Sequence, residues 1–200
     1  MQWLVSGFLV FSLVSVNVHA KGKYERSEDQ ASIGWEDSDS SFSNTDLRRE
    51  LQSRAAKNQH SLGYKGARIE LMGRISLKHD ARGYYIRDVY CEKNFNGAPG
   101  RIPDDKIINT EHTWPQSRFG GSGRDMQKSD LHHLFPSDSE LNSNRGNHPF
   151  GEVKSNSQTL KCTQSRAGSN VDGDFVFEPP VEHRGNVARA LFYFAVRYGM

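Results

Sequence analysis

Cysteine is scarce in this chain: Cys91 and Cys162 are the only two among 200 residues. Their spacing matches none of the short Cys/His patterns that hold structural zinc, so a small zinc-stabilised domain is not indicated. In an oxidising compartment an even pair predicts one disulfide, and closing a loop of about 71 residues would contribute roughly 4 kcal/mol. The alternative is a pair of buried thiols.

A hydrophobic run long enough to cross a membrane is also lacking at the N-terminus. The apolar run from Trp3 to Val18 has about 16 residues, short of the roughly 20 that a membrane span needs. Val18 and Ala20 are small side chains at positions −3 and −1 of a cut before Lys21, as in an export signal. No lysine or arginine precedes the run, unlike in most signals, and a membrane anchor is the alternative. We expect residues 1–20 to be a cleaved signal peptide and the mature protein to be secreted or periplasmic, monomeric and without stable membrane association.

Apolar residues are few overall, at 35% of the chain with a mean hydropathy of −0.74. Much of the polarity lies in residues 21–44, which are rich in serine and carry three basic and six acidic side chains. Such a segment buries too little apolar surface to offset the entropy lost on ordering, so we predict a flexible linker. Because the whole chain carries +2, residues 45–200 carry +5, a weak indication of a polyanionic partner. We predict one domain over residues 45–200.

The segment between residues 109 and 150 concentrates polar side chains that are costly to bury without a function. Four elements are predicted around it: a strand at 107–110, a Gly-rich loop at 118–124, a second strand at 131–135 and a helix from about 139. Pro115 and Pro136 would stop the two strands, and Ser137 or Asp138 can cap the helix, which Gly146 would end. The order strand, loop, strand, helix predicts a ββα unit.

Glu111, His112 and Asn142 within this segment suit the hydrolysis of a phosphodiester bond. That reaction needs an activated water and neutralisation of the charge that grows on the phosphate oxygens. A neutral imidazole can accept the proton of water near pH 7, which makes His112 the candidate base. One carboxylate and one amide suit Mg²⁺, which keeps most of its own waters, so Glu111 and Asn142 are the candidate ligands. Because adjacent strand residues point to opposite faces, Glu111 and His112 share a site only if the strand ends or bulges there.

Several separated motifs resemble the endonuclease I family of secreted bacterial nucleases. They are Glu-His-Thr-Trp-Pro-Gln-Ser at 111–117, Asp-Leu-His-His-Leu-Phe-Pro at 130–136, Glu-Leu-Asn-Ser-Asn-Arg-Gly at 140–146 and Phe-Glu-Pro-Pro at 177–180. The resemblance implies a ββα-metal (His-Me finger) motif and Mg²⁺-dependent cleavage of DNA, often also of RNA, with little sequence preference and 5′-phosphate products. It makes Glu111 and Asn142 the Mg²⁺ ligands and His112 the general base, with Mn²⁺ or Ca²⁺ as candidate replacements for Mg²⁺.

The resemblance also implies an arginine that binds the scissile phosphate between the first motif and the second strand. Arg118 and Arg124 both fall there. We favour Arg118, because the short motif after Trp114 holds it at a constant place, and Arg124 remains the alternative. Arg145, three residues after Asn142 on the expected helix, could face the same site or form a structural salt bridge.

Other segments predict helices and one clear strand. Helices are expected at 45–57, 63–72 and 186–198, a strand at 84–90 and an extended segment at 176–180. The last helix carries apolar residues nearly all around it, which predicts a core helix, and shows no capping signal before Met200. The expected fold class is α+β, with a small mixed sheet and helices around the ββα-metal motif.

Two further interpretations compete with the nuclease. His112, His132, His133, His148 and Cys162 are numerous enough to hold zinc, although two adjacent strand histidines should face opposite sides. Members of the family usually continue past the aromatic helix, which would make this chain truncated at its C-terminus. The alternative function is therefore a secreted nucleic-acid-binding protein of nuclease ancestry, inactive through truncation.

Overall fold

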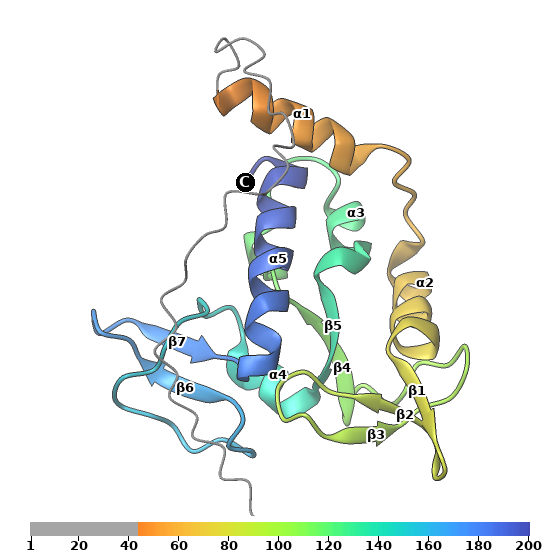
Figure 1. Cartoon of the computed structure of the whole chain (residues 1–200), viewed down its shortest axis with the longest axis vertical. Coiled ribbons are helices and arrows are strands. Elements are labelled where there is room, and N and C mark those ends of the chain that lie inside the picture. Colours follow the sequence, from red (N-terminus) through yellow and green to blue (C-terminus); the bar gives the residue numbers. More distant parts are fainter. Residues whose placement is uncertain (1–43) are drawn as a thin grey trace, which may run out of the picture. The chain divides into compact units, whose positions relative to one another are not determined.

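The computed structural model describes residues 44–200, so the expectations for the signal peptide and for residues 21–43 lie outside the described residues. Within this range, helices and three small antiparallel sheets confirm the α+β class (Figure 1). The sheets join β1 (Leu77–Asp80), β2 (Gly83–Arg87) and β3 (Asn94–Asn96); β4 (Ile108–His112) and β5 (Leu134–Asp138); and β6 (Arg166–Ser169) and β7 (Phe175–Glu178). The helices are α1 (Asn44–Ala56), α2 (Gly63–Glu70), α3 (Arg124–Ser129), α4 (Ser139–Arg145) and α5 (Val181–Tyr198). None of the helices in this part of the chain has the length and apolar content that a membrane crossing requires.

The predicted ββα unit is present. Strand β4 pairs with β5 so that Glu111 lies opposite Phe135 and His112 opposite Leu134, and α4 follows β5 without a loop. Asp138 caps the N-terminus of the helix, because its carboxylate accepts hydrogen bonds from the backbone N–H groups of Glu140 and Leu141. Gly146, with a φ of +56°, ends it as predicted.

The second strand of this unit begins three residues later than predicted. Residues Leu131–His133 form a 3-10 turn, η3, because the Asp130 carboxylate accepts the backbone N–H of His132 and holds the chain in a turn. Strand β5 then continues through Pro136, which was wrongly expected to stop it. The β4–β5 sheet has two strands, so the missing N–H of a proline at its free edge costs no pairing.

The loop expected at residues 118–124 is shorter in the structure. A 3-10 turn, η2 (Gln116–Arg118), precedes it, and the short helix α3, which was not predicted, follows it. Gly123, with a φ of +87°, lies immediately before α3 and allows the chain to turn into the helix. This helix brings the backbone of residues 127–128 towards the ends of both strands of the ββα unit.

The remaining predictions hold with shifted boundaries. Helix α2 continues into a π-helical turn, η1 (Leu71–Ile75), and β2 ends at Arg87 because the Asp88 carboxylate folds residues 90–93 into a turn through their backbone N–H groups. Helix α5 begins five residues earlier than predicted and is buried on one side only, since the apolar Phe192 is 75% exposed, so it is not the core helix expected. It also has a capping residue, contrary to expectation: Gly199 has a φ of +69° and ends the helix.

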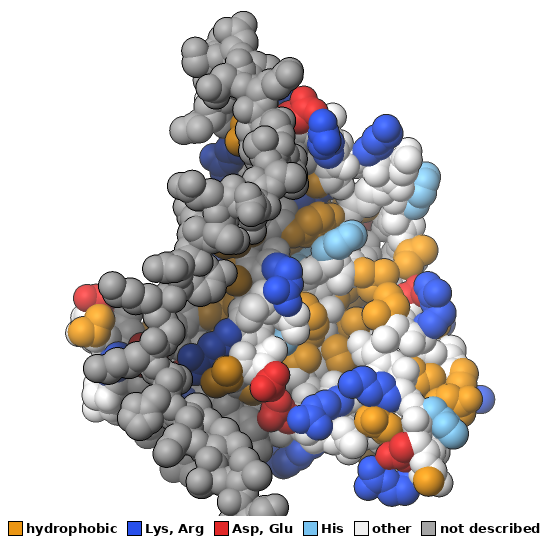
Figure 2. All heavy atoms as spheres, in the orientation of Figure 1, with side chains coloured by type: hydrophobic (Ala, Val, Ile, Leu, Met, Phe, Trp, Pro, Cys, Tyr) orange, Lys and Arg blue, Asp and Glu red, His pale blue; other side chains and the backbone are white. Residues whose placement is uncertain are grey.

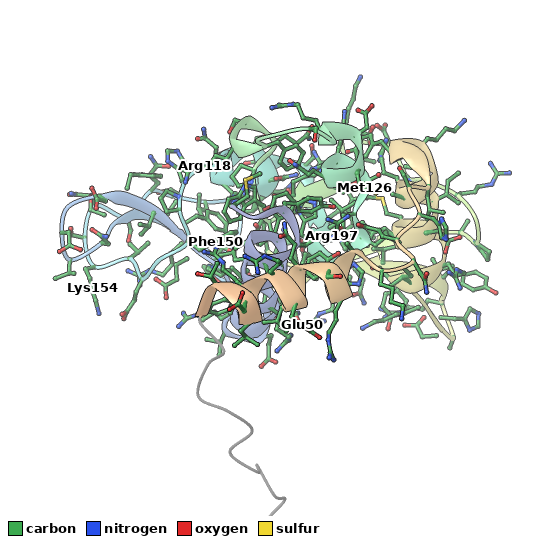
Figure 3. All side chains as sticks on the ribbon, turned by 90° about the horizontal axis from the view of Figure 1, so that it is seen from above. Glu50, Arg118, Met126, Phe150, Lys154 and Arg197 are labelled. Carbon is green, nitrogen blue, oxygen red and sulfur yellow. A yellow bond between two sulfur atoms is a disulfide. The ribbon has the colours of Figure 1, made fainter. Side chains whose placement is uncertain are left out.

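Two apolar clusters support the ββα unit. One packs α2 and η1 against β2, β4 and β5, and the other gathers Tyr90, Leu141 and Phe177 around the first cysteine. At the other end of the domain, α1 lies across the C-terminal part of α5 (Figures 1 and 3). The side-chain amide of Gln52 donates to the carbonyl of Arg197 in this contact.

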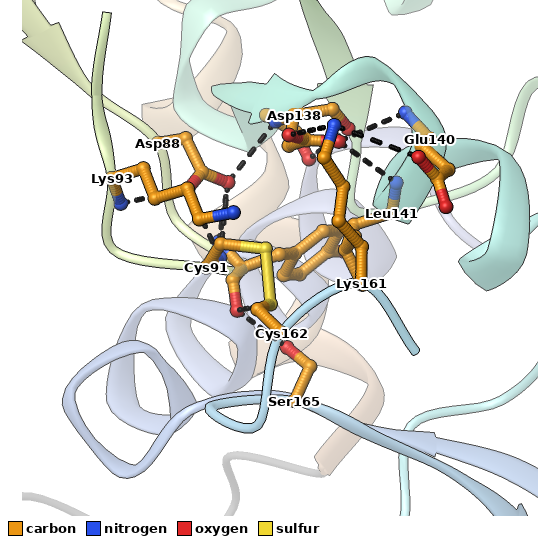
Figure 4. The surroundings of a disulfide bond; sticks show 11 residues. Asp88, Cys91, Lys93, Asp138, Glu140, Leu141, Lys161, Cys162 and Ser165 are labelled. Atoms are coloured by element: carbon orange, nitrogen blue, oxygen red, sulfur yellow. Dashed lines mark hydrogen bonds and ion pairs between the residues drawn. A yellow bond between two sulfur atoms is a disulfide. The ribbon is translucent and has the colours of Figure 1, made fainter. Parts of the chain in front are cut away.

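Cys91 and Cys162 form a disulfide, which confirms the predicted bridge (Figure 4). It joins the turn after β2 to the loop before β6, where the hydroxyl of Ser165 also donates to the carbonyl of Tyr90. The bridge therefore secures the surroundings of Tyr90, whose buried ring packs on Phe177.

Loss of the disulfide should destabilise the domain. We expect Cys91→Ser to lower the free energy of unfolding by about 4 kcal/mol, because the unfolded chain regains the freedom of the closed loop. Denaturant unfolding measures this change. Cys162→Ser and the double variant should cost about the same as the first variant, since all three remove one bond. Alkylation of a cysteine in the native, unreduced protein would contradict the bridge.

Candidate active site

The end of β4 and the side of α4 line an open cavity of about 440 Å³. Glu111, His112, Asn142 and Arg145 all line it, so the structure brings together the three residues that the sequence nominated as base and ligands. Glu111 and His112 are the last two residues of β4 and both are still paired with β5, and both line this cavity where the strand ends.

Glu111 is a buried carboxylate with only 1% of its surface exposed. Its Oε1 lies 2.9 Å from Nη1 of Arg145, but the N–H groups of that guanidinium are directed at backbone carbonyls, so Oε1 receives no directed hydrogen bond. Burial raises the pKa of Glu111, while the charge of Arg145 and the hydroxyl of Tyr90 act in the opposite direction. The ion pair thus stabilises the charged form of the buried carboxylate.

His112 is held in one tautomer. Its Nε2 lies 3.1 Å from the carbonyl oxygen of Lys128, which can only accept, so Nε2 carries the ring proton. Nδ1 therefore has the lone pair, and the side-chain amide of Gln116, another cavity residue, donates to it at 3.3 Å. Burial, aided by the neighbouring His133, lowers the pKa of His112 to about 3. The ring is consequently neutral at pH 7 and offers Nδ1 as a base.

Asn142 presents an oxygen from the first turns of α4. Its Nδ2 donates to Oδ1 of Asn109 at 2.7 Å and to the carbonyl of Thr110 at 3.2 Å. Both bonds use the nitrogen, which orients the amide and leaves Oδ1 for a ligand. A carboxylate oxygen of Glu111 and the Oδ1 of Asn142 are the hard oxygen donors that a Mg²⁺ ion with several retained waters requires, so the residues present fit such an ion.

The zinc interpretation is not supported by the arrangement of its proposed ligands. Cys162 is in the disulfide and has no thiolate to offer. His132 is exposed and pairs with Asp130 at 2.9 Å, whereas His133 is buried and directs Nε2 at the carbonyl of Gln127. Within residues 44–200, no three His, Cys, Asp or Glu side chains are close enough together to hold a metal ion.

The two histidines of η3 also differ from their expected placement. They lie in a 3-10 turn rather than on opposite faces of a strand. The ring of His133 packs 5.5 Å from that of His112, between centroids, and the ring of His132 stacks on Tyr193 at 4.4 Å. His133 therefore supports the candidate base, and His132 belongs to a surface contact with α5.

The three candidate arginines have different surroundings. Arg118 is exposed in η2 (Figure 3) and donates one hydrogen bond, to the carbonyl of the cavity residue Asn147 at 3.3 Å. Arg124 donates to the carbonyls of Phe119 and Gln116 and so ties the loop between η2 and α3. Arg145 is buried in the cavity wall itself. Which arginine contacts phosphate stays a prediction, with Arg118 at the rim of the cavity.

Asp130 is a buried anchor that sequence reasoning did not single out. Its carboxylate accepts hydrogen bonds from the ring and backbone of His132, from the hydroxyls of Tyr193 and Tyr198, and from Gln59. These contacts tie the segment that holds His112 to α5 and to the chain after α1. Burial alone would raise the pKa of Asp130, but the hydrogen bonds from His132 and the tyrosines outweigh it and lower the pKa below the ordinary value.

Asp130 should therefore contribute stability that depends on pH. Because its pKa is lower in the folded state, the contribution is complete above the ordinary value of about 4 and is lost as the pH falls towards the folded value. We expect Asp130→Asn to cost about 2 to 3 kcal/mol at pH 7 and to remove that part of the acid dependence. Urea unfolding from pH 3 to 7 measures both effects, with replacement of the exposed Asp125 of α3 (Asp125→Asn) as the control. An unchanged pH dependence in Asp130→Asn would contradict the assignment.

The chain contains the ββα unit expected of a ββα-metal (His-Me finger) motif, with Glu111, His112 and Asn142 lining one cavity. The family model for Endonuclease I matches residues 43–200, and the chain belongs to the endonuclease I family. It is 39% identical over 106 residues to the extracellular ribonuclease of Bacillus subtilis (strain 168), covering 53% of this chain and 33% of the relative. It is 41% identical over 90 residues to the extracellular ribonuclease of Bacillus amyloliquefaciens, covering 45% of this chain and 29% of the relative.

A third relative carries the family's name. The chain is 34% identical over 138 residues to Endonuclease-1 of Buchnera aphidicola subsp. Acyrthosiphon pisum (strain APS), covering 59% of this chain and 48% of the relative. The chain thus spans about a third to a half of the length of these three curated relatives.

Proposed function

We propose that this protein is an exported, metal-dependent endonuclease that hydrolyses phosphodiester bonds of DNA, and also of RNA, with little sequence preference. The observation that carries the proposal is the shared cavity of His112, Glu111 and Asn142. A neutral imidazole, whose Nδ1 accepts a 3.3 Å hydrogen bond from the side-chain amide of Gln116, lies beside the ion-paired carboxylate of Glu111 and the Oδ1 of Asn142. Membership of the endonuclease I family supports this reading.

Each residue has a separate role in the proposed reaction. His112 accepts a proton from the attacking water at Nδ1, because its Nε2 is already protonated and bound to the carbonyl of Lys128. Glu111 and Asn142 would hold Mg²⁺, which when bound neutralises charge on the phosphate oxygens. Arg118 at the rim would bind a phosphate oxygen of the substrate.

The substrate class follows from charge and from the relatives. Lys and Arg side chains are spread across the face in Figure 2, with fewer Asp and Glu among them. This distribution agrees with the +5 of residues 45–200 and suits a nucleic-acid backbone. Two relatives are named ribonucleases and one an endonuclease, so the proposal includes both nucleic acids. The two ribonucleases are named extracellular, which supports export, and the proposal also includes a monomer without stable membrane association.

Digestion of a supercoiled plasmid and of a structured RNA, each with Mg²⁺ and with EDTA, tests the proposal. We expect nicking and linearisation of the plasmid and fragmentation of the RNA, both abolished by EDTA and restored by added Mg²⁺. Cleavage that persists in EDTA would refute the metal dependence. Retardation of DNA without any cleavage would favour a binding protein of nuclease ancestry.

The choice between Arg118 and Arg124 can be tested by kinetics. We expect Arg118→Ala to reduce kcat/KM about 10- to 100-fold, the loss of one charge-assisted phosphate contact of roughly 1.5 to 3 kcal/mol, with an unchanged melting temperature. Arg124→Ala should instead lower the melting temperature, because Arg124 ties a loop through two carbonyls. The opposite pattern in the two variants would transfer the phosphate role to Arg124.

A further inference from the structure

Arg145 makes an unusual set of contacts with three consecutive residues of the chain. Its Nη1 donates to the carbonyl of His112 at 2.9 Å and its Nη2 to the carbonyl of Thr113 at 2.7 Å. The same Nη1 lies 2.9 Å from Oε1 of Glu111. Only 2% of Arg145 is exposed, so these contacts are made away from water.

Arg145 makes these contacts at the C-terminal end of β4. Glu111 and His112 are the last two residues of β4, and both line the same cavity. A guanidinium presents two N–H groups as a rigid planar fork, which matches two successive carbonyls and which a lysine ammonium cannot reproduce. Arg145 thus fixes the backbone at the end of β4, next to the two residues that line the cavity.

Two further features of the structure fix the position of the Arg145 guanidinium. Its central carbon lies 4.4 Å from the centroid of the Phe150 ring (Figure 3 labels Phe150), and its backbone ends α4, whose N-terminus Asp138 caps. Asn142 lies on the same helix three residues earlier. Helix α4 therefore carries both a candidate metal ligand and the group that orients the other candidate ligand and the base.

The two terminal nitrogens of Arg145 are already engaged, which distinguishes it from a phosphate-binding arginine. They donate to three backbone carbonyls, those of His112, Thr113 and Gly146, and lie beside the carboxylate of Glu111, while Nε has no hydrogen-bond partner. Arg145 is also buried, whereas Arg118 is exposed with a single long hydrogen bond. Removing its charge would leave the Glu111 carboxylate buried without a counter-ion.

We propose that Arg145 is a positioning residue that sets the geometry of Glu111 and His112 at the end of β4. The inference rests on the proposed function for its catalytic consequence, but the geometry that it predicts can be observed without substrate or metal.

Arg145→Lys and Arg145→Gln test this inference. The first readout is the NMR signal of the His112 ring N–H, which should shift in Arg145→Lys and more strongly in Arg145→Gln. The second is binding of Mn²⁺ to the protein alone, followed by electron paramagnetic resonance, where we expect a weaker affinity by about 10-fold for Lys and more for Gln. The third is plasmid cleavage, where kcat should fall while KM stays near that of the wild type.

Arg184 offers a matched control, because it pairs with Glu178 at 2.5 Å in another part of the domain. Arg184→Lys and Arg184→Gln should leave all three readouts unchanged. Circular dichroism melts identify folded variants, and Arg145→Lys, which keeps the charge, serves if Arg145→Gln does not fold. A folded Arg145 variant with the wild-type ring signal and Mn²⁺ affinity would overturn the proposal. A wild-type protein that neither binds Mn²⁺ nor cleaves would refute the proposed function, and the ring signal would still decide the role of Arg145.

Discussion

Replacement of His112 by alanine should abolish nicking of supercoiled plasmid while binding of the same DNA stays near the wild-type level. General base catalysis by a positioned imidazole contributes about 10²- to 10⁴-fold to a rate, so the loss should be at least of that order. The structure makes the expectation specific, because Nδ1 of His112 is the only ring nitrogen with a lone pair once Nε2 donates to Lys128.

The control for this variant is His79→Ala, which removes an exposed histidine from β1 in a different sheet. It should cleave like the wild type. A thermal melt must accompany His112→Ala, since the ring is buried and contacts Tyr64, Phe119 and His133. Cleavage retained by a folded His112→Ala protein would refute the assignment of the base.

The second large effect is expected at the metal ligands. Glu111→Gln and Asn142→Ala should each lower cleavage on the order of 100-fold at low Mg²⁺, and excess Mg²⁺ should partly restore it. The estimate is conservative, because partners that only orient metal ligands already cost 10- to 100-fold when they are changed. Measuring the initial nicking rate over a range of Mg²⁺ concentrations gives the apparent affinity for the ion.

Two features make these variants interpretable. Glu111→Gln is preferable to alanine, because it fills the same space beside the buried Arg145, and its melting temperature reports the cost of losing the ion pair. Glu140→Gln removes an exposed carboxylate from the same helix as Asn142 and should behave like the wild type. If added Mg²⁺ never improves either ligand variant, their role as ligands is wrong.

Much of the fold was predictable wherever the determining interactions are local. Asp138 caps α4, Gly146 ends it and the order of strand, strand and helix follows from residues only a few positions apart. The disulfide was also predictable, since two cysteines offer a single pairing. The turn at Leu131–His133 was missed although it is also local, because the apolar pattern favoured a strand and did not show that the Asp130 carboxylate accepts the backbone N–H of His132.

The candidate site was likewise predictable from the sequence only in part. The residue types in the Glu-His and Asn motifs nominated a base and two ligands, and the structure places them around one cavity. The sequence could not assign a role to Arg145, because its place three residues after Asn142 suited an active-site residue and a structural salt bridge equally well. It proves to be both part of the cavity wall and the partner of Glu111.

The amino-acid sequence by itself determined the α+β class, the ββα order, the disulfide and the candidate residues Glu111, His112 and Asn142. The tertiary structure decided which nitrogen of His112 is free and that two adjacent strand residues share a cavity. Those answers depend on the carbonyl of Lys128, 16 residues from His112, and on Arg145, 33 residues away. Such contacts form only when α3 and α4 pack beside β4, and no periodicity along the chain encodes the direction of a single hydrogen bond.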